Sequence, residues 1–363
     1  MNDQRDRKWS GAVFALVCDD NLNYAANALA LEMTTKVDAD IHVFIETKPR
    51  VDYVIQRIEH PQILYHHNVL FKNIDAEVHD NPRFSRAAWG RIMLPKILGA
   101  YKRIIYCDID VLLGELDPHI LNIDLPNGIG MVRDENDILP TKRKLPENQA
   151  RFRLGEKYFN SGFIIIDPSN WDSNAVQNEL TYFFNSGNAA VAPFVDQDFL
   201  NTHFINRIVE LSPLYNLQYR SINLGALKPS RVAIRHFIVG EKPYYQTNDI
   251  YSPKTIKTSR ENYAKMLANT GIDLDKIPNR STSKRRAIKA IIRKTLYNYG
   301  VKTFRTIELH RRWVQDHETF VSYLKEGTKG VFQDNFSLDD ILKTQNPKFD
   351  GFEYYTADQA HTQ

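Results

Sequence analysis

Two aspartates separated by a single residue follow a short apolar run in the sequence. Asp108 and Asp110 flank Ile109 and come directly after residues 103–107, Arg-Ile-Ile-Tyr-Cys. Two carboxylates held close together repel each other, so without a nearby cation one of them is driven toward its neutral form. Mg²⁺ or Mn²⁺ supplies such a cation and is usually held by carboxylates together with the phosphates of a substrate. The pair therefore predicts a divalent metal site, although an acidic pair that only caps a strand explains these residues equally well.

The elements that position this pair are predicted from the pattern of apolar residues. Residues 103–110 have the apolar, β-branched and aromatic character of a buried strand. Side chains at i and i+2 on a strand share a face, so we expect Asp108 and Asp110 to leave the sheet edge together while Ile109 turns toward the core. Further strands are predicted at residues 11–18, 40–46, 63–69, 129–133, 159–166 and 232–239. Their alternation with helices predicts an α/β fold with a central mixed, mostly parallel sheet flanked by helices.

Two segments between the predicted strands bear on the site. Residues 85–100 have a helical apolar pattern with Pro95 as a kink, and the polar residues 134–157 are interpreted as a mobile loop. The sequence contains neither a Walker-type phosphate loop nor a Gly-x-Gly-x-x-Gly motif. Ligands of open α/β sheets bind at the carboxyl ends of the strands. We therefore expect the site where Asp19 and Asp110 follow their strands.

More polar clusters lie at the ends of predicted strands or at the start of a predicted helix. They are Asp19 with Asn21, Asn160 with Ser161, Asp196-Gln197-Asp198, and His236 with Lys242. Each has a structural explanation as well as a functional one. Asp196 could simply be the N-cap of its helix, an isolated histidine is more often a core residue than a metal ligand, and an isolated lysine is more often solvated. No cluster is specific on its own.

Together and in this order, these motifs resemble those of the family 8 glycosyltransferases, retaining enzymes of the GT-A fold that use a nucleotide sugar. The carrying segments are residues 18–21, 89–92, 106–110, 159–162, 196–198 and 236–244. The resemblance covers roughly residues 11–246. The family includes bacterial enzymes that add glucose or galactose to lipopolysaccharide cores. A UDP-sugar donor, either UDP-glucose or UDP-galactose, and a saccharide or glycolipid acceptor are therefore expected.

The resemblance also implies roles for the nucleotide end of the site. Asp108, Asp110 and His236 would bind Mn²⁺ (or Mg²⁺), which bridges the donor diphosphate, and Lys242 would lie on the diphosphate. Asp19 and Asn21 would face the uracil. Ile109, Ser161 and Gly240 complete the expected nucleotide-sugar-binding residues. The sequence departs from the family pattern at Leu22, where an aromatic residue often stands, and at Gly240, which comes one place late.

For the donor sugar, the resemblance implies a second set of residues. They are Arg91, Asp134, Asn160, Asp196 and Gln197. Asp196, Gln197 and Asp134 are the expected catalytic residues. Retention could use a covalent carboxylate intermediate or attack on the same face as the departing phosphate. Gln197 is a poor nucleophile, which favours the same-face route without excluding the other.

Composition and charge indicate in which compartment the protein works and what it can bind. The 42% of hydrophobic residues suffice for a sizeable core, and the apolar runs are far shorter than the roughly 20 residues of a membrane span. Cys18 and Cys107 sit in strand-like runs and are expected to be buried free thiols, which suits a reducing cytoplasm. We divide the chain into a GT-A catalytic domain at residues 11–255 and a mostly helical extension at residues 256–363.

Positive charge is concentrated in that extension. Residues 276–313 hold twelve Lys and Arg and one acid, Glu308. Within them, residues 284–299 predict a basic amphipathic helix, which is typical of a peripheral anchor on an anionic membrane. A helix docked on the catalytic domain explains the pattern almost as well, and no nucleic-acid partner is expected because no recognised binding module surrounds it. The expected location is the cytoplasmic face of the inner membrane.

Two other classes of function compete with a glycosyltransferase. One is a catalytically silent nucleotide-sugar- or glycan-binding protein of the same fold. The other is a basic membrane adaptor whose α/β body is incidental. The paired aspartates with His236 and Lys242 favour the enzyme, because a silent protein has no need of a metal set.

Overall fold

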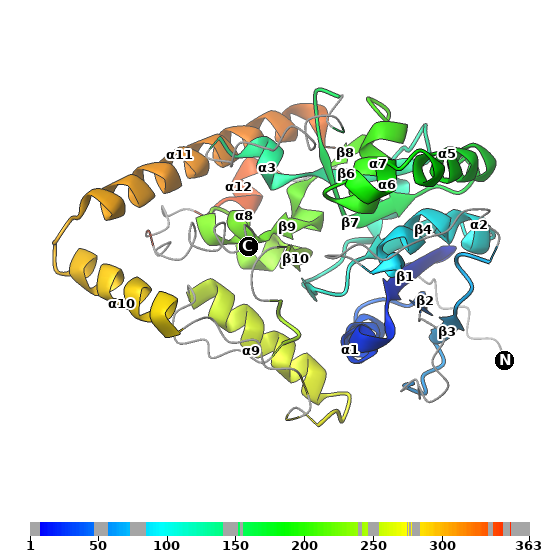
Figure 1. Ribbon diagram of the computed structural model, residues 1–363, viewed down its shortest axis with the longest axis horizontal. Helices are drawn as coiled ribbons and strands as arrows, with labels where there is room; N and C mark the ends of the chain where they lie inside the picture. The colour runs from blue at the N-terminus through cyan, green and yellow to red at the C-terminus, as the bar shows by residue number, and fades with distance from the viewer. Residues whose placement is uncertain are drawn as a thin grey trace. The chain divides into compact units, whose positions relative to one another are not determined.

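The computed structural model divides the chain into two compact units (Figure 1). It describes residues 8–46, 57–72, 85–140, 152, 155–238, 242–245, 254–273, 275, 277, 284–332, 337–343 and 349. The first unit comprises residues 1–109, 116–133 and 144–211, and the second comprises residues 110–115, 134–143 and 212–363. The chain therefore passes from one unit to the other several times. One of these passages separates Asp108 from Asp110.

The first unit is built on a seven-stranded sheet with the order β3-β2-β1-β4-β7-β6-β8. Its strands are β1 (Ala12–Cys18), β2 (Asp40–Ile45), β3 (Ile63–His67), β4 (Arg103–Cys107), β6 (Ile129–Arg133), β7 (Phe159–Ile166) and β8 (Val209–Leu211). Only β7 runs against its neighbours β4 and β6, while the other described pairs are parallel. The central strand β1 is buried along its whole length, as a strand covered on both faces must be. The expectation of a mixed, mostly parallel sheet is confirmed.

Helices pack against this sheet and bury a common apolar core. They are η1 (Asp20–Leu22), α1 (Asn23–Thr34), η2 (Arg86–Met93), α2 (Leu94–Leu98), η3 (Pro118–Asn122), α5 (Ser173–Asn185), α6 (Asn188–Val191) and α7 (Val195–His203). Helix α1 contacts β1 and β2, and α7 contacts β7. Large side chains such as Trp89, Tyr106 and Phe199 fill the core between these elements. Both cysteines are buried thiols, as expected.

Residues 85–100 form two elements rather than one kinked helix. The first is the 3-10 helix η2, and the second is α2, in which Pro95 lies in the first turn. Proline is favoured at this position because its missing N–H would have no helical partner there. Gly90 lies so close to its neighbours that a Cβ atom would come within 2.6 Å of Leu70 Cδ1. The close approach of backbone and sheet explains a glycine here.

The second unit combines a small sheet with most of the C-terminal helices. Its sheet has the order β5-β10-β9, with β5 (Val111–Leu113), β9 (Leu217–Gln218) and β10 (Ile234–His236). Its helices are α3 (Glu135–Ile138), η4 (Pro213–Tyr215), α8 (Tyr219–Leu224), η5 (Pro229–Arg231), α9 (Lys254–Ala268), α10 (Lys284–Asn298), α11 (Phe304–Glu326), the π-helix η7 (Gly327–Val331) and α12 (Leu338–Ile341). The expected helical extension is present, and β10 is shorter than the strand predicted for residues 232–239.

Three further expectations can be compared with this fold. Strand β4 ends at Cys107, so the aspartate pair lies beyond the strand, where the chain leaves the large sheet for β5. Most of the segment interpreted as a loop, from residue 141 to 154, and Gly240 lie outside the described residues, which include only Phe152 of that stretch. None of the helices in the described part of the chain combines the length and apolar character that a membrane span requires.

Candidate functional site

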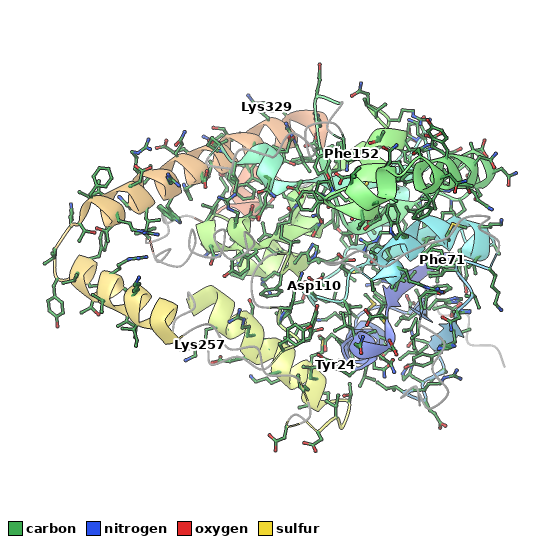
Figure 2. The ribbon with its side chains drawn as sticks, viewed as in Figure 1. Tyr24, Phe71, Asp110, Phe152, Lys257 and Lys329 are labelled. Atoms are coloured by element: carbon green, nitrogen blue, oxygen red, sulfur yellow. The ribbon has the colours of Figure 1, made fainter. Side chains whose placement is uncertain are left out.

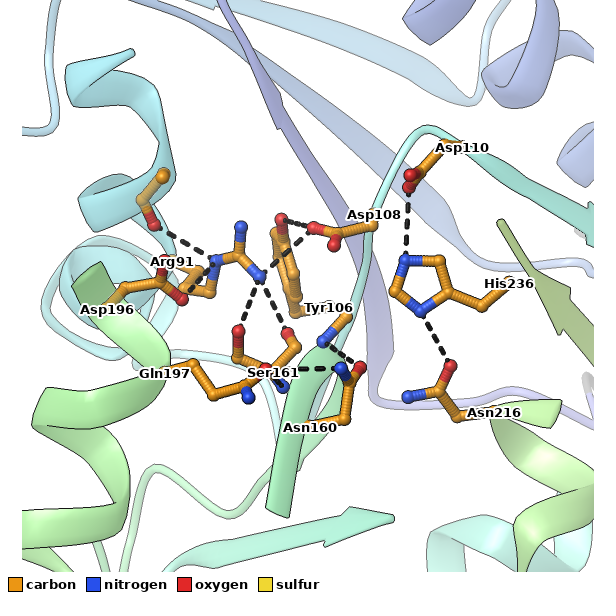
Figure 3. A network of polar contacts seen from close by, with 12 residues as sticks. Arg91, Tyr106, Asp108, Asp110, Asn160, Ser161, Asp196, Gln197, Asn216 and His236 are labelled. Carbon is orange, nitrogen blue, oxygen red and sulfur yellow. Dashed lines mark hydrogen bonds and ion pairs between the residues drawn. The ribbon is translucent and has the colours of Figure 1, made fainter. Parts of the chain in front are cut away.

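Arg91 is the centre of a polar network in the first unit (Figure 3). Its guanidinium donates through Nη1 to the carbonyl oxygen of Ser161 at 2.7 Å and to Ser161 Oγ at 3.1 Å. It also forms ion pairs with Asp108 at 3.0 Å and with Asp196 at 3.2 Å. The side chain is only 8% exposed. The buried guanidinium of Arg91, from η2, therefore contacts residues at the end of β4, the start of β7 and the start of α7.

Tyr106 also orients the Asp108 carboxylate, through a hydrogen bond. The Tyr106 hydroxyl donates to Asp108 Oδ1, and the Arg91 guanidinium lies 4.5 Å from the centre of the Tyr106 ring. Tyr106 precedes Asp108 by two residues, so the spacing that suggested a shared face holds between these two. Burial raises the pKa of Tyr106 well above its ordinary value, which keeps the hydroxyl protonated as a donor.

The backbone is strained at the start of α7, directly before Asp196 and Gln197. Val195 has φ of +39°, a conformation that is unfavourable for a β-branched residue. Asp198 holds this turn, because its Oδ2 accepts from the Phe194 backbone N–H at 2.8 Å and its Oδ1 accepts from the Tyr158 hydroxyl at 2.5 Å. The helix begins at Val195, so Asp196 lies in its first turn and is not its N-cap. Strain held by neighbouring groups is typical of a functional turn.

Burial also affects the protonation of Asp196. It raises the pKa of this carboxyl to about 6, even though the Arg91 guanidinium opposes the shift. The neighbouring Gln197 uses its Oε1 atom to accept from Asn160 Nδ2 and from the Ser161 backbone N–H, each at 3.1 Å. Asn160 in turn accepts from the Gly162 backbone N–H at 3.0 Å. The amides of the predicted sugar site are thus fixed in orientation before any ligand binds.

The second unit contains a compact cluster around Asp110. The His236 Nε2 atom lies 3.2 Å from Asp110 Oδ1, and the Lys242 ammonium donates to Asp110 Oδ2 and to the Phe237 carbonyl oxygen. Asp110 and His236 are almost fully buried. Burial alone would raise the pKa of Asp110, but Lys242 and then His236 hold the pKa well below its ordinary value. This carboxyl is therefore ionised at neutral pH.

Asn216 determines which nitrogen of His236 is available to bind a cation. Its Oδ1 atom lies 2.9 Å from His236 Nδ1, so Nδ1 carries the proton and donates it (Figure 3). The Nε2 atom then faces the Asp110 carboxylate, to which the protonated imidazole donates. Once Nε2 has lost its proton, its lone pair and the carboxylate are two ligands for a cation, and a histidine oriented by a second hydrogen bond is the usual metal ligand. Asp110 and His236 are therefore candidate metal ligands within the second unit, and the role of Asp108 as the third ligand stays a prediction.

Asp134 and Glu135 connect α3 to α8 within the second unit. Asp134 is the N-cap of α3, accepting from the Asn136 backbone N–H at 2.8 Å. The Glu135 carboxylate accepts from the backbone N–H groups of Arg220 at 2.9 Å and Ser221 at 3.1 Å, the start of α8. Burial raises the pKa of Glu135 to about 8, against the opposing charge of Arg220. Asp134 is thus held in place by its neighbour.

Asp19 also has a local structural role. It caps η1 by accepting from the Asn21 backbone N–H at 3.0 Å, and burial raises its pKa. Asn21 is exposed. The expected roles of both residues toward a nucleotide stay predictions, as do the ligand contacts of the other site residues.

Within each unit, the structure brings together most of the residues predicted from the motifs. In the first unit, Arg91 links Asp108, Ser161 and Asp196, and Gln197 links Asn160 to Ser161. In the second, Asp110, His236 and Lys242 form one cluster, and Asp134 caps α3. The sequence reasoning missed Tyr106, Asn216 and Tyr158. Tyr106 could have been found from its i, i+2 spacing to Asp108, whereas Asn216 and Tyr158 lie in no recognisable motif.

Comparisons with known proteins agree with this arrangement. The sequence model of glycosyl transferase family 8 matches residues 25–247. General stress protein A of Bacillus subtilis (strain 168) is 25% identical over 256 residues, a match that covers 62% of this chain and 85% of that protein.

Solved structures show the same fold. The galactosyltransferase LgtC, in complex with donor and acceptor sugar analogues, has a TM-score of 0.50 at 16% identity, covering 71% of this chain and 95% of its own. An active-site mutant of LgtC has a TM-score of 0.53 at 16% identity, with the same coverage. The bifunctional glycosyltransferase WbbM has a TM-score of 0.50 at 15% identity, covering 74% of this chain and 51% of its own. The expected GT-A-like fold is confirmed.

Proposed function

The chain belongs to glycosyl transferase family 8, and we propose that it is a retaining, metal-dependent hexosyltransferase that moves glucose or galactose from a UDP-sugar to a saccharide acceptor. Membership of the family supports a glycosyltransferase that uses a nucleotide-sugar donor. The observation that carries the finer proposal is the cluster of Asp110, His236 and Lys242. An ionised carboxylate, an imidazole with its Nε2 lone pair available and an ammonium group suit a cation and a diphosphate.

In this proposal, Asp110 and His236 hold a divalent cation, with Asp108 as the third ligand. A bound Mn²⁺ or Mg²⁺ would supply the positive charge that stabilises a departing nucleoside diphosphate. The chain's own residues prepare for that charge. Asn216 fixes the protonated nitrogen of His236, and Lys242 adds an ammonium group that neutralises the diphosphate.

The network around Arg91 is proposed to bind the donor sugar. Asp196, Asn160 and Gln197 offer directional acceptors and donors for sugar hydroxyls. The Gln197 amide is fixed by two hydrogen bonds, and an amide is a poor nucleophile, so attack on the same face as the leaving phosphate suits this site better than a covalent intermediate on Gln197. We propose that Asp134 approaches the same sugar from the start of α3.

The acceptor and the location follow from a different part of the chain. We propose that the acceptor is a lipopolysaccharide or another cell-surface saccharide, glycosylated at the cytoplasmic face of the inner membrane. The segment predicted as a basic amphipathic helix, residues 284–299, forms helix α10, and its Ile288, Ile291 and Ile292 side chains are exposed. Exposed apolar residues on a basic helix support an interfacial anchor more than a docked helix.

Donor hydrolysis in the absence of acceptor tests the enzymatic proposal. The native protein is expected to release UDP from UDP-glucose or UDP-galactose when Mn²⁺ is present, and to lose this activity with EDTA. Asp110→Ala should abolish the metal-dependent part, because it removes the carboxylate that contacts both His236 and Lys242. UDP release measured by a coupled assay, with each sugar and with and without Mn²⁺, provides the comparison.

Glu115→Ala is the matched control, because Glu115 is an exposed carboxylate just beyond β5. It should hydrolyse the donor as the native protein does. Tight UDP binding without turnover of any UDP-sugar would contradict the proposal and favour the catalytically silent binding protein. Turnover that is unaffected by EDTA and by Asp110→Ala would contradict the metal site.

A further inference from the structure

The turn that joins α10 to α11 exposes a group of large apolar side chains. Among the described residues, seven of the eleven exposed large apolar side chains lie between residues 288 and 307: Ile288, Ile291, Ile292, Tyr299, Val301, Phe304 and Ile307. Phe304 is 88% exposed and Tyr299 is 83% exposed. Figure 2 shows the side chains along α10 and α11 projecting from the ribbon. A group of exposed apolar side chains of this kind marks a site where a protein partner or a membrane binds.

The turn itself is well defined by hydrogen bonds. Gly300 has φ of +79°, its N–H donates to the Tyr297 carbonyl, and the Val301 N–H donates to the Leu296 carbonyl at 2.8 Å, which is a Schellman motif. Thr303 then begins α11 with a capping box shared with Thr306. Both ends of the turn are therefore fixed. The exposure of its apolar side chains is a property of the folded hairpin, and binding does not have to order the turn first.

The surroundings of the turn are strongly cationic. Lys289, Lys294 and Lys302 are exposed. Burial, and then the charge of nearby Arg305, lowers the pKa of Arg293. The one acid in residues 276–313, Glu308, accepts hydrogen bonds from Arg311 and Arg312 further along α11. The charge of Glu308 is therefore paired with these two arginines and does not neutralise the cations at the turn. An anionic surface is the complement of such a region.

We propose that the α10–α11 turn inserts Tyr299, Val301 and Phe304 into the interface of an anionic lipid bilayer, with the flanking lysines and arginines against the lipid headgroups. This inference rests on the proposed membrane location and adds the inserting element, which lies at the end of α10 and continues into α11. A bilayer offers a continuous negative surface above an apolar interior. It therefore matches both the ring of cations and the apolar tip within it.

Vesicle flotation of the full chain tests the proposal. The native protein should float with vesicles of phosphatidylcholine and phosphatidylglycerol in equal parts, and much less with phosphatidylcholine alone. Phe304→Ser and Tyr299→Ser should each lower the partition coefficient about tenfold, since each removes one large apolar side chain from the interface. Tyr182→Ser is the matched control, because Tyr182 is 64% exposed on α5 in the first unit. It should float as the native protein does.

Insertion has its own optical signal. Phe304→Trp should show a blue-shifted emission on binding the anionic vesicles, and Tyr182→Trp should not. Flotation of Phe304→Ser and Tyr299→Ser at the native level would overturn the proposal. So would a stable dimer of the native protein that Phe304→Ser dissociates, because a second copy of the chain would then cover the patch. Donor hydrolysis without vesicles should be unchanged in all these variants, so failure of the insertion and failure of the enzymatic proposal are distinguishable.

Discussion

A single hydrogen bond gives His236 its direction in the candidate site. Asn216 accepts from Nδ1, which leaves Nε2 toward Asp110. Without that acceptor the ring could exchange its protonated nitrogen or rotate away from Asp110. Asn216 would thus act on the proposed metal site through the histidine, and its contribution can be measured without removing any proposed ligand.

Asn216→Ala is expected to raise the Mn²⁺ concentration needed for half-maximal donor hydrolysis by about ten- to hundredfold, as loss of such supporting partners does in metal sites. The rate at saturating Mn²⁺ should recover toward the native rate. Asn223→Ala is the control, since Asn223 is also partly buried and its amide donates to the Tyr219 carbonyl within α8. Equal Mn²⁺ dependence in the two variants would refute the role of Asn216.

At the residue scale, the sequence identified the functional side chains more readily than the residues that they contact. Asp108, Asp110 and His236 are recognisable because they follow apolar strands in a family order. The contact of Arg91 with Ser161 joins residues 70 positions apart, and local spacing carries no information about such a pair. Asn216 lies between Tyr215 and Leu217 in an otherwise apolar stretch, where nothing in the sequence distinguishes it from a turn residue.

Among the elements, the entrance to α7 shows how local strain is maintained. A β-branched residue at positive φ costs about 1–3 kcal/mol, and Val195 adopts this conformation. The Asp198 carboxylate supports the turn from two sides, through the Phe194 N–H and the Tyr158 hydroxyl. The position of Asp196 and Gln197 therefore depends on the Tyr158 hydroxyl, which acts through the Asp198 carboxylate.

Tyr158→Phe is expected to lower kcat for donor hydrolysis by about ten- to hundredfold with little change in KM, because a loosened turn misplaces groups around the sugar. It should also lower the free energy of unfolding by about 1–2 kcal/mol, because a buried carboxylate loses a donor. Tyr101→Phe is the control, since it loses a hydrogen bond to Asp40 away from the network. A similar fall in kcat for both variants would indicate general destabilisation instead of positioning.

The long strands were predictable, and the small elements were not. Strand β1 is apolar over all seven of its positions, and β7 ends in the apolar run Phe163–Ile166, so both strands are recognisable from their pattern. Strands β5 and β9 have three and two residues, which is too short for any periodicity to appear. The apolar residues of the helical pattern in residues 85–100 are buried except Ile97, and the sequence did not indicate that η2 would wind as a 3-10 helix.

For the whole molecule, one buried carboxyl predicts how stability depends on pH. Glu135 has a pKa of about 8 in the fold and an ordinary value of 4.5. Between these values the folded chain binds a proton that the unfolded chain does not. Stability from this group is therefore complete below about pH 4.5 and is lost as the pH rises through 8.

Glu135→Gln should remove this part of the pH dependence, since a neutral amide keeps an acceptor for the backbone N–H groups of Arg220 and Ser221. Urea unfolding at a series of pH values from 5 to 9 should show a smaller decline for the variant than for the native protein. Glu115→Gln, at an exposed site, should decline as the native protein does. Parallel curves for native protein and Glu135→Gln would disprove the assignment.

The order in which the ribosome delivers the chain constrains assembly of the second unit. Strand β5 emerges early, but its neighbour in the described sheet is β10, with Leu113 opposite Ile234. Until β10 has been synthesised, the apolar strand β5 has an unpaired edge, and other chains can pair with it. Completion of this sheet also brings His236 to Asp110. A nascent or truncated chain that ends before β10 therefore has an aggregation-prone edge and lacks His236 beside Asp110, and the same strand pairing supplies both the missing neighbour and the missing ligand.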